Sequence, residues 1–400
     1  MATAVASEPA RSHRPLEGAT AAAPPARRER LVALDVFRGL TVAGMLLVNN
    51  PGTWSAIYPP LAHATWHGWT PTDLIFPFFL FIVGVTTHLS LEARRARGDD
   101  ESALLRQVLV RGSLIILFGL LLASFPWWPI SRITTVRFPG VLQRIGLAYM
   151  AGALLTRRTT WRQQVGILGA LLLGYWALMT LVPVPGYGLG PQNLDDPSAS
   201  LAAWLDRAVF GSHLWRSSVT WDPEGLLSTM PAVGTVVLGV LAGRWLGEPR
   251  PLSERLTGLF GAGSILMVAG LMWHWGFPIN KSLWTSSYVL FTGGMAAVAL
   301  ATCTWLIDVL GITSWTVPFR WYGMNPMVAF LGSGAMARLM GLITVPVDGA
   351  PVPLQRVIFD RGFASWLAPR PASLLYAVSF VLVWAGILGW LYRKRVFFKV

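Results

Sequence analysis

The residues most able to do chemistry lie in one stretch, VNNPGTWSAIYPPLAHATWHGWTPTD, at positions 48–73. It contains two asparagines, two histidines, an aspartate and three tryptophans, and it separates two long apolar runs. Polar and ionisable side chains are costly at membrane depth, so where they gather they usually mark a functional site. We therefore expect the site to form around this stretch.

His63 is the central candidate in it, because few side chains exchange a proton near neutral pH. Asn49 precedes it and offers an amide donor, and Asp73 follows it. His67 would share a face with His63 if this segment were helical. Two histidines without a third and fourth ligand nearby do not predict a zinc site. We expect acid–base chemistry here, without a metal.

The composition indicates a membrane protein. Of the 400 residues, 54% are hydrophobic and only 13% are charged, whereas about a quarter are charged in a typical soluble domain. The mean hydropathy is +0.52. The net charge of +13 is concentrated between apolar runs, as the positive-inside rule expects, so nucleic acid is not an expected partner. The single Cys303 excludes disulfides within the chain.

The apolar runs are continuous, which favours helices over a barrel. We predict an all-α polytopic membrane protein, a single bundle of about ten transmembrane helices. Each apolar run is close to the roughly 20 residues that cross a bilayer core. The expected spans are 32–52, 71–91, 104–124, 138–156, 164–182, 226–246, 256–276, 284–306, 318–340 and 371–392.

The distribution of Lys and Arg predicts the orientation. Segments such as RRER, RRAR and RRTTWR alternate with segments poorer in positive charge, which places both termini in the cytoplasm. The outer side then receives 53–70, 183–225, the turn at Asn280 and Lys281, and 341–369. Residues 1–30 are expected to form a disordered cytoplasmic tail, and 31–400 a single transmembrane domain.

Charged residues inside the expected spans need partners or water. Asp35 and Arg38 are three residues apart and can pair on one helix. Asp73 and Arg144 both fall near outer span ends, so we consider a pair between them. The other arginines within spans are Arg111 and Arg338.

Further polar groups stand at the entrances of spans. They are Gln143 in GVLQRIG, Asp222 and Glu224 in WDPEG, Asn280, Lys281 and Trp284 in PINKSLWT, and Asn325 in FRWYGMNPM. Acidic residues at a helix start are often only caps or partners of the helix dipole. Because several of these groups fall on the outer side with His63, we expect a shared polar cavity.

The motifs together resemble one family. LDVFRGL, LLVNN, HATWHGWTPTDLIFPFFLFIVG, PGVLQRIGLAY, DPEGLLST, INKSLWTSSYV and YGMNPM resemble the transmembrane heparan-alpha-glucosaminide N-acetyltransferase family, in family order. The resemblance implies transfer of acetyl from cytosolic acetyl-CoA to the amino group of a terminal glucosamine across the membrane. It implies that His63 is the catalytic histidine and Asn49 its neighbouring active-site asparagine.

Roles for the other residues follow from this chemistry. His63 would be the general base, with Asp73 beside it, and Asn49 would donate to the oxyanion. Direct transfer and an acetyl-His63 intermediate are both compatible with these residues. The residues expected to bind acetyl-CoA are Arg38, Arg111, Gln143, Arg144 and Asn325, with Arg320 as a further cation at the cytoplasmic mouth. The residues expected to bind the acceptor are His67, Asp222, Glu224, Asn280, Lys281 and Trp284.

The remaining expectations concern the cellular location, the partners and two alternative functions. The basic tail and the absence of a signal peptide or luminal domain suggest a bacterial cytoplasmic membrane, with a periplasmic or lipid-linked amino sugar as acceptor. Membrane lipids are the other expected partner, and the oligomeric state, a homodimer included, stays open. One alternative is an O-acyltransferase that acts on an envelope glycan. The other is a transporter of a sugar or lipid-linked precursor.

Overall fold

The computed structural model describes residues 31–127, 135–189 and 191–398, and the tail predicted for 1–30 lies outside them. The described residues form thirteen α-helices and one two-stranded antiparallel hairpin. The elements are α1 (Val32–Asn49), α2 (Ile75–Arg95), α3 (Glu101–Ser124), α4 (Val141–Thr156), α5 (Trp161–Leu181), α6 (Leu201–Phe210), α7 (Thr229–Leu246), α8 (Leu252–Trp273), α9 (Ser286–Thr304), α10 (Thr316–Met324), α11 (Pro326–Leu342), β1 (Thr344–Val347), β2 (Ala350–Pro353), α12 (Leu354–Phe359) and α13 (Pro369–Arg393).

The protein is an all-α polytopic membrane protein, as predicted. Eight helices in the described residues are long and apolar enough to cross a membrane, and α4 and α11 are shorter apolar helices. The observed helices follow the expected spans, with one exception described below. α5 begins with a reciprocal cap in which the Gln163 side chain accepts from the Thr160 N–H and the Thr160 hydroxyl accepts from the Gln163 N–H, satisfying donors that a helix start leaves free.

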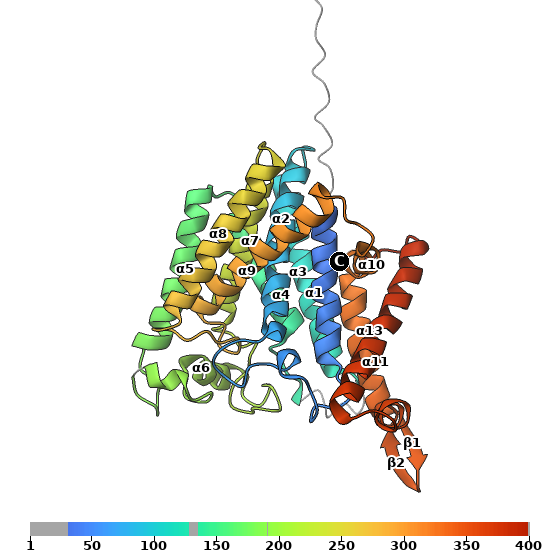
Figure 1. Ribbon diagram of the computed structural model, residues 1–400. Coiled ribbons are helices and arrows are strands. Elements are labelled where there is room, and N and C mark those ends of the chain that lie inside the picture. The colour runs from blue at the N-terminus through green and yellow to red at the C-terminus, as the bar shows by residue number, and fades with distance from the viewer. Residues whose placement is uncertain (1–30, 128–134, 190, 399–400) are drawn as a thin grey trace, which may run out of the picture. The chain divides into compact units, whose positions relative to one another are not determined.

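The helices alternate in direction, so their connections separate onto two sides (Figure 1). One side carries the segment after α1, the short helix α6 and the β1–β2 hairpin, and we call it the site side. The opposite side carries the turns between α2 and α3 and between α7 and α8. The Arg-rich segments RRAR, between α2 and α3, and RRTTWR, between α4 and α5, lie on the opposite side, so the predicted alternation agrees with the described part of the fold.

The single span predicted for 318–340 is wrong. The chain forms two helices there, α10 and α11, which meet at Asn325 with φ −130° and ψ 51°. Pro326 lacks an N–H and disfavours helical geometry in the residue before it, so the helix stops at this point. The predicted loops at 183–225 and 341–369 also contain structure, namely α6 in the first and the hairpin with α12 in the second.

Glycines allow the helices that frame the site to approach closely. A Cβ on Gly39 of α1 would collide with the backbone of Phe319, and one on Gly323 of α10 would collide with that of Asp35. Gly239 and Gly243 of α7 lie in the same way against the backbone of α2. The GxxxG spacing in this span therefore serves helix packing, as expected.

Candidate active site

The segment between α1 and α2 holds the site residues through a compact series of turns. Pro59–Leu61 and Pro71–Leu74 form single 3-10 turns, each starting with a proline whose missing N–H costs nothing there. Thr70 caps the second turn: its N–H donates to the Asp73 carboxylate, and the Asp73 N–H donates to the Thr70 carbonyl. The turn fixes Asp73 at the start of the second membrane helix.

His63 and Asp73 form the centre of the site. Nδ1 of His63 lies 2.7 Å from Oδ1 of Asp73. The Asp73 side chain is 1% exposed and that of His63 is 46% exposed. The other carboxylate oxygen, Oδ2, accepts from the N–H groups of Ala64 and Thr70, both at 3.0 Å. A buried carboxylate thus holds a histidine whose other edge remains accessible.

This geometry assigns the histidine's tautomer. An ionised carboxylate can only accept hydrogen bonds, so Nδ1 of His63 carries the proton and donates it to Asp73. The lone pair of the neutral ring then resides on Nε2. A histidine oriented in this way by a carboxylate is suited to take a proton from a bound molecule.

Lys281 approaches this pair from a distant part of the chain. Its Nζ lies 3.3 Å from both ring nitrogens of His63. An ammonium equidistant from the two nitrogens is not in line with the lone pair of either. Burial lowers the pKa of Lys281, against the opposing charges of Glu224 and Asp73. The amino group of Lys281 therefore lies directly against the histidine ring.

A cavity of about 130 Å³ opens beside His63. Its polar end is formed by Asn49, His63, Glu224 and Lys281. The rest is lined mainly by apolar side chains of α1, α2, α4 and α11, including Met45, Phe79, Ile145 and Phe330. Along α1 it extends from Asn49 to Thr41, about 12 Å of helix. Of the outer polar groups expected to share a cavity, His63, Glu224 and Lys281 line this one, while His67, Asp222, Asn280 and Trp284 do not, and the cavity continues inward as an apolar channel.

The amide of Asn49 is available at this cavity. Its side chain is exposed, and in the described part of the chain it makes no hydrogen bond. The neighbouring Asn50, in contrast, donates to the Leu46 carbonyl. Of the two adjacent asparagines, Asn49 is the one that can bind a molecule in the cavity.

Arg137 organises the acidic side of the cavity, and the sequence reasoning missed it. Its guanidinium donates to both Asp222 and Glu224, with Nε 2.8 Å from Asp222 Oδ2. Burial opposes ionisation of Glu224, but Arg137, Arg144 and Lys281 outweigh it and lower its pKa. Burial likewise opposes the charge of Arg137, but the two acids hold its pKa above the ordinary value. The position of Arg137 just before the motif PGVLQRIG is the sequence feature that could have identified it.

Comparison with known proteins assigns the chain to a family. The family model described as heparan-alpha-glucosaminide N-acetyltransferase, catalytic, matches residues 30–270. The chain belongs to this family. It is 29% identical to the heparan-alpha-glucosaminide N-acetyltransferase of Homo sapiens and 28% identical to that of Mus musculus. Each alignment covers 93% of this chain and 60% of the relative, so the chain spans less than two thirds of either relative's length.

In this family member Arg144 does not pair with Asp73, so that expectation is wrong. Arg144 donates to Ser228 and to the Gly225 carbonyl, and its guanidinium lies 5.1 Å from the centre of the Trp284 ring. Asp73 is already saturated by His63 and by backbone N–H groups. Both residues are buried near the site side, but they belong to two different polar clusters.

His67 and Asn280 form a separate contact from His63. His67 lies 2.9 Å from Asp195 through Nε2 and 3.3 Å from the Asn280 amide through Nδ1. The segment that carries the two histidines is not helical, so they do not share a helix face. Trp284 is buried, has φ 52°, and donates its indole N–H to Thr235. These residues connect the loop of His63 to the start of α9.

The predicted nucleotide-binding residues are dispersed. Arg38 pairs with Asp35 at 3.2 Å, as predicted, and donates to the Gly323 carbonyl. Arg320 donates to Tyr392, and Arg111 lies over the Tyr149 ring. Asn325 is buried and forms hydrogen bonds with Val396 and Phe398. Gln143 lines a second cavity, on the site side. Within the described residues, no group of His, Cys, Asp and Glu could hold a metal ion.

Proposed function

We propose that this family member is a transmembrane acetyltransferase that moves acetyl from acetyl-CoA to the amino group of an amino sugar, with His63 as general base. One observation carries the proposal: His63, held by the buried Asp73, stands at the polar end of an apolar channel. A base at the end of such a channel suits a reaction between a molecule threaded through it and one that arrives from the site side.

The channel fits the thin arm of acetyl-CoA. At about 130 Å³ it is smaller than the roughly 300–1,000 Å³ of ordinary small-molecule sites, so it would take the pantetheine arm and not the nucleotide. The nucleotide would stay on the opposite side, where Arg38 and Arg320 supply cations. We further propose that this side is the cytoplasm of a bacterium, that both termini lie there, and that residues 31–400 form the catalytic domain.

Acetyl-CoA supplies an acetyl group activated as a thioester. The acceptor nitrogen forms a bond to the carbonyl carbon, and the carbon–sulfur bond breaks with its electron pair on the CoA sulfur. The proton lost by the amine passes to Nε2 of His63 and from there to the departing thiolate. An amine attacks only when it is unprotonated, which is why a base is needed.

Asn49 and Lys281 are suited to the charge that develops in this reaction. The tetrahedral intermediate carries an oxyanion, and the unused amide of Asn49 is a donor at the same cavity. The Lys281 ammonium lies against His63 and adds positive charge at that end of the cavity. The acetyl group would therefore react between a base and two donors.

The decisive experiment follows isotopically labelled acetyl-CoA and glucosamine with the purified protein in detergent, and identifies the product by mass spectrometry. Labelled N-acetylglucosamine is expected from the wild type. His63→Ala should lose a factor of about 10²–10⁴ in rate while still binding acetyl-CoA, and His67→Ala should lose much less.

Other results would redirect the proposal. An acetylated hydroxyl in the product would indicate an O-acyltransferase. Uptake of an intact sugar into proteoliposomes without release of CoA would indicate a transporter. If His63→Ala acetylates at the wild-type rate, the assignment of the base and the mechanism built on it are wrong.

A further inference from the structure

A second, larger cavity lies next to the cavity of His63. Its volume is about 640 Å³, and it is formed by the end of α3, the start of α4, the segment 215–216 and the end of α11. Val141, Leu142 and Phe330 line both cavities. The two cavities are therefore adjacent, with these three side chains between them.

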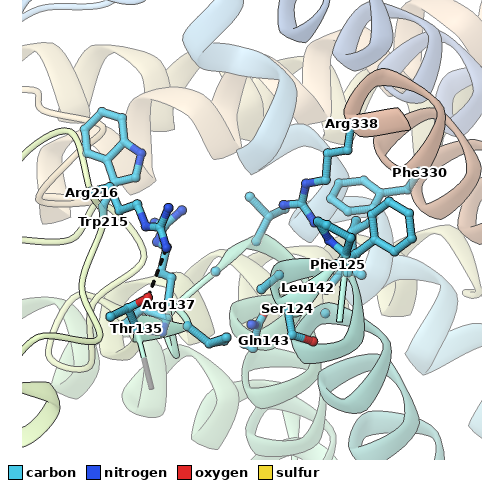
Figure 2. Close-up of a pocket in the computed structure, with 18 of the residues that line it drawn as sticks. Ser124, Phe125, Thr135, Arg137, Leu142, Gln143, Trp215, Arg216, Phe330 and Arg338 are labelled. Carbon is cyan, nitrogen blue, oxygen red and sulfur yellow. Dashed lines mark hydrogen bonds between the residues drawn. The ribbon is translucent and has the colours of Figure 1, made fainter. Parts of the chain in front are cut away.

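Among the described residues, the charged side chains that line the larger cavity are all arginines: Arg137, Arg216 and Arg338. Arg137 forms ion pairs with both Asp222 and Glu224, so it offers no uncompensated charge to the cavity. Arg216 donates to the Thr135 hydroxyl at 3.0 Å but forms no ion pair within the described residues. Figure 2 shows Arg216 and Arg338 on opposite sides of the cavity, each extending toward its interior. The cavity therefore carries net positive charge.

Arg338 needs an explanation of its own. It lies on the membrane helix α11, and it makes no hydrogen bond or ion pair with any residue that the structure describes. Arg338 is exposed where it lines the cavity, and a guanidinium near membrane depth is stable only where water or an anion accompanies it. The start of α4 faces the same cavity at Gly140 and has no side-chain cap, and its free N–H groups add to the attraction for an anion.

We infer that this cavity binds a phosphate group of the acceptor, on the sugar whose amine reaches His63. The inference rests on the proposed function and names its substrate class. Arginine is well suited to phosphate because its fork matches the phosphate oxygens. A volume of about 640 Å³ is within the range of small-molecule sites and suits a sugar phosphate. Phe125, Phe330 and Leu342 give part of the wall an apolar surface, which is compatible with either a soluble sugar phosphate or a lipid-linked one.

The test compares three acceptors: glucosamine, glucosamine 1-phosphate and glucosamine linked to a polyprenyl phosphate. For the wild type, kcat/KM should be at least about tenfold higher with phosphate than without it, the size expected of charge-assisted hydrogen bonds. Arg338→Gln and Arg216→Gln should each reduce this ratio several-fold. Arg361→Gln removes an exposed arginine on the same side and should leave the ratio unchanged. Preference for the third acceptor over the second would identify the phosphate as lipid-linked.

A binding measurement separates this inference from the proposed function. Trp215 lines the cavity, so titration with glucosamine 1-phosphate should change the tryptophan fluorescence of the wild type, and the affinity should fall in Arg338→Gln. Binding that depends on Arg338 without any acetyl transfer would overturn the proposed function and keep the inference. Acetyl transfer with no preference for phosphate, or a preference that survives in Arg338→Gln, would overturn the inference and keep the function.

Discussion

The substitution Asp73→Asn tests the arrangement of the site most directly. Asp73 is buried, and its carboxylate accepts from Nδ1 of His63, from the Ala64 and Thr70 N–H groups and from the Thr70 hydroxyl. Asparagine has nearly the same shape and keeps one oxygen for the backbone donors. Its NH₂ group, however, then faces Nδ1 of His63, and two donors cannot bond to each other.

The histidine can restore a hydrogen bond only by changing its tautomer. Nδ1 then becomes the acceptor and Nε2 carries the proton, so Nε2 can no longer take a proton from the acceptor amine. A general base contributes about 10²–10⁴ in rate. We expect Asp73→Asn to lower kcat about 10³-fold, which corresponds to about 4 kcal/mol at roughly 1.4 kcal/mol for each tenfold change. The loss of stability should be smaller, about 1–3 kcal/mol.

The assay measures kcat for acetyl transfer, the affinity for acetyl-CoA and the thermal melting of the same preparations. Acetyl-CoA affinity should change little, because Asp73 does not line the channel. Thr70→Val is the matched control: it removes a hydroxyl that donates to the Ala62 carbonyl at 2.6 Å and contacts Asp73 at 3.2 Å but leaves the bond between Asp73 and His63, so it should cost only a few-fold. Residues that act as a unit are not additive, so the double variant with His63→Ala should be as slow as His63→Ala alone. A near-normal rate for Asp73→Asn, or multiplied losses in the double variant, would refute the reasoning.

Two further predictions concern the acidic side of the site. Arg137→Gln leaves the buried Asp222 without its ion-pair partner and removes one of the cations that act on Glu224, so the free energy of unfolding should fall by about 3–5 kcal/mol. Neutralising both acids as well should recover most of the lost melting temperature, and no recovery would argue against the pairing. Burial raises the pKa of Asp206 to about 7, so the folded protein holds a proton between pH ~4 and ~7 that the unfolded chain releases. The free energy of unfolding should therefore fall as pH rises through that window. The melting temperature of Asp206→Asn should depend less on pH in this window than that of the wild type.

The sequence alone predicted the class of fold and most of its helices. Apolar runs of bilayer length and the alternating placement of Arg-rich segments are local features, so they can be identified without tertiary contacts. The break at Asn325 was missed because a hydrophobic run does not show where a helix stops. Pro326 was the local signal for it.

The sequence also indicated where the site lies, since polar groups that cluster between membrane spans need a reason to be there. It named His63, Asn49 and Asp73 together, and the structure places His63 and Asp73 in direct contact. The proposed pair of Asp73 and Arg144 was wrong because membrane depth limits which charges can meet but does not choose among them. Several buried charges had similar depth, and only packing decided their partners.

By itself, the sequence determined the helices, their alternation and the stretch that carries the base, because these depend on composition and short-range spacing. Tertiary structure alone placed Lys281 against His63, 218 residues away, and joined Arg137 to Asp222 and Glu224. It also made two adjoining cavities, one apolar beside the base and one lined by arginines. Contacts between distant segments depend on how the helices pack, and helix packing depends on side-chain shapes across the whole bundle rather than on any local pattern.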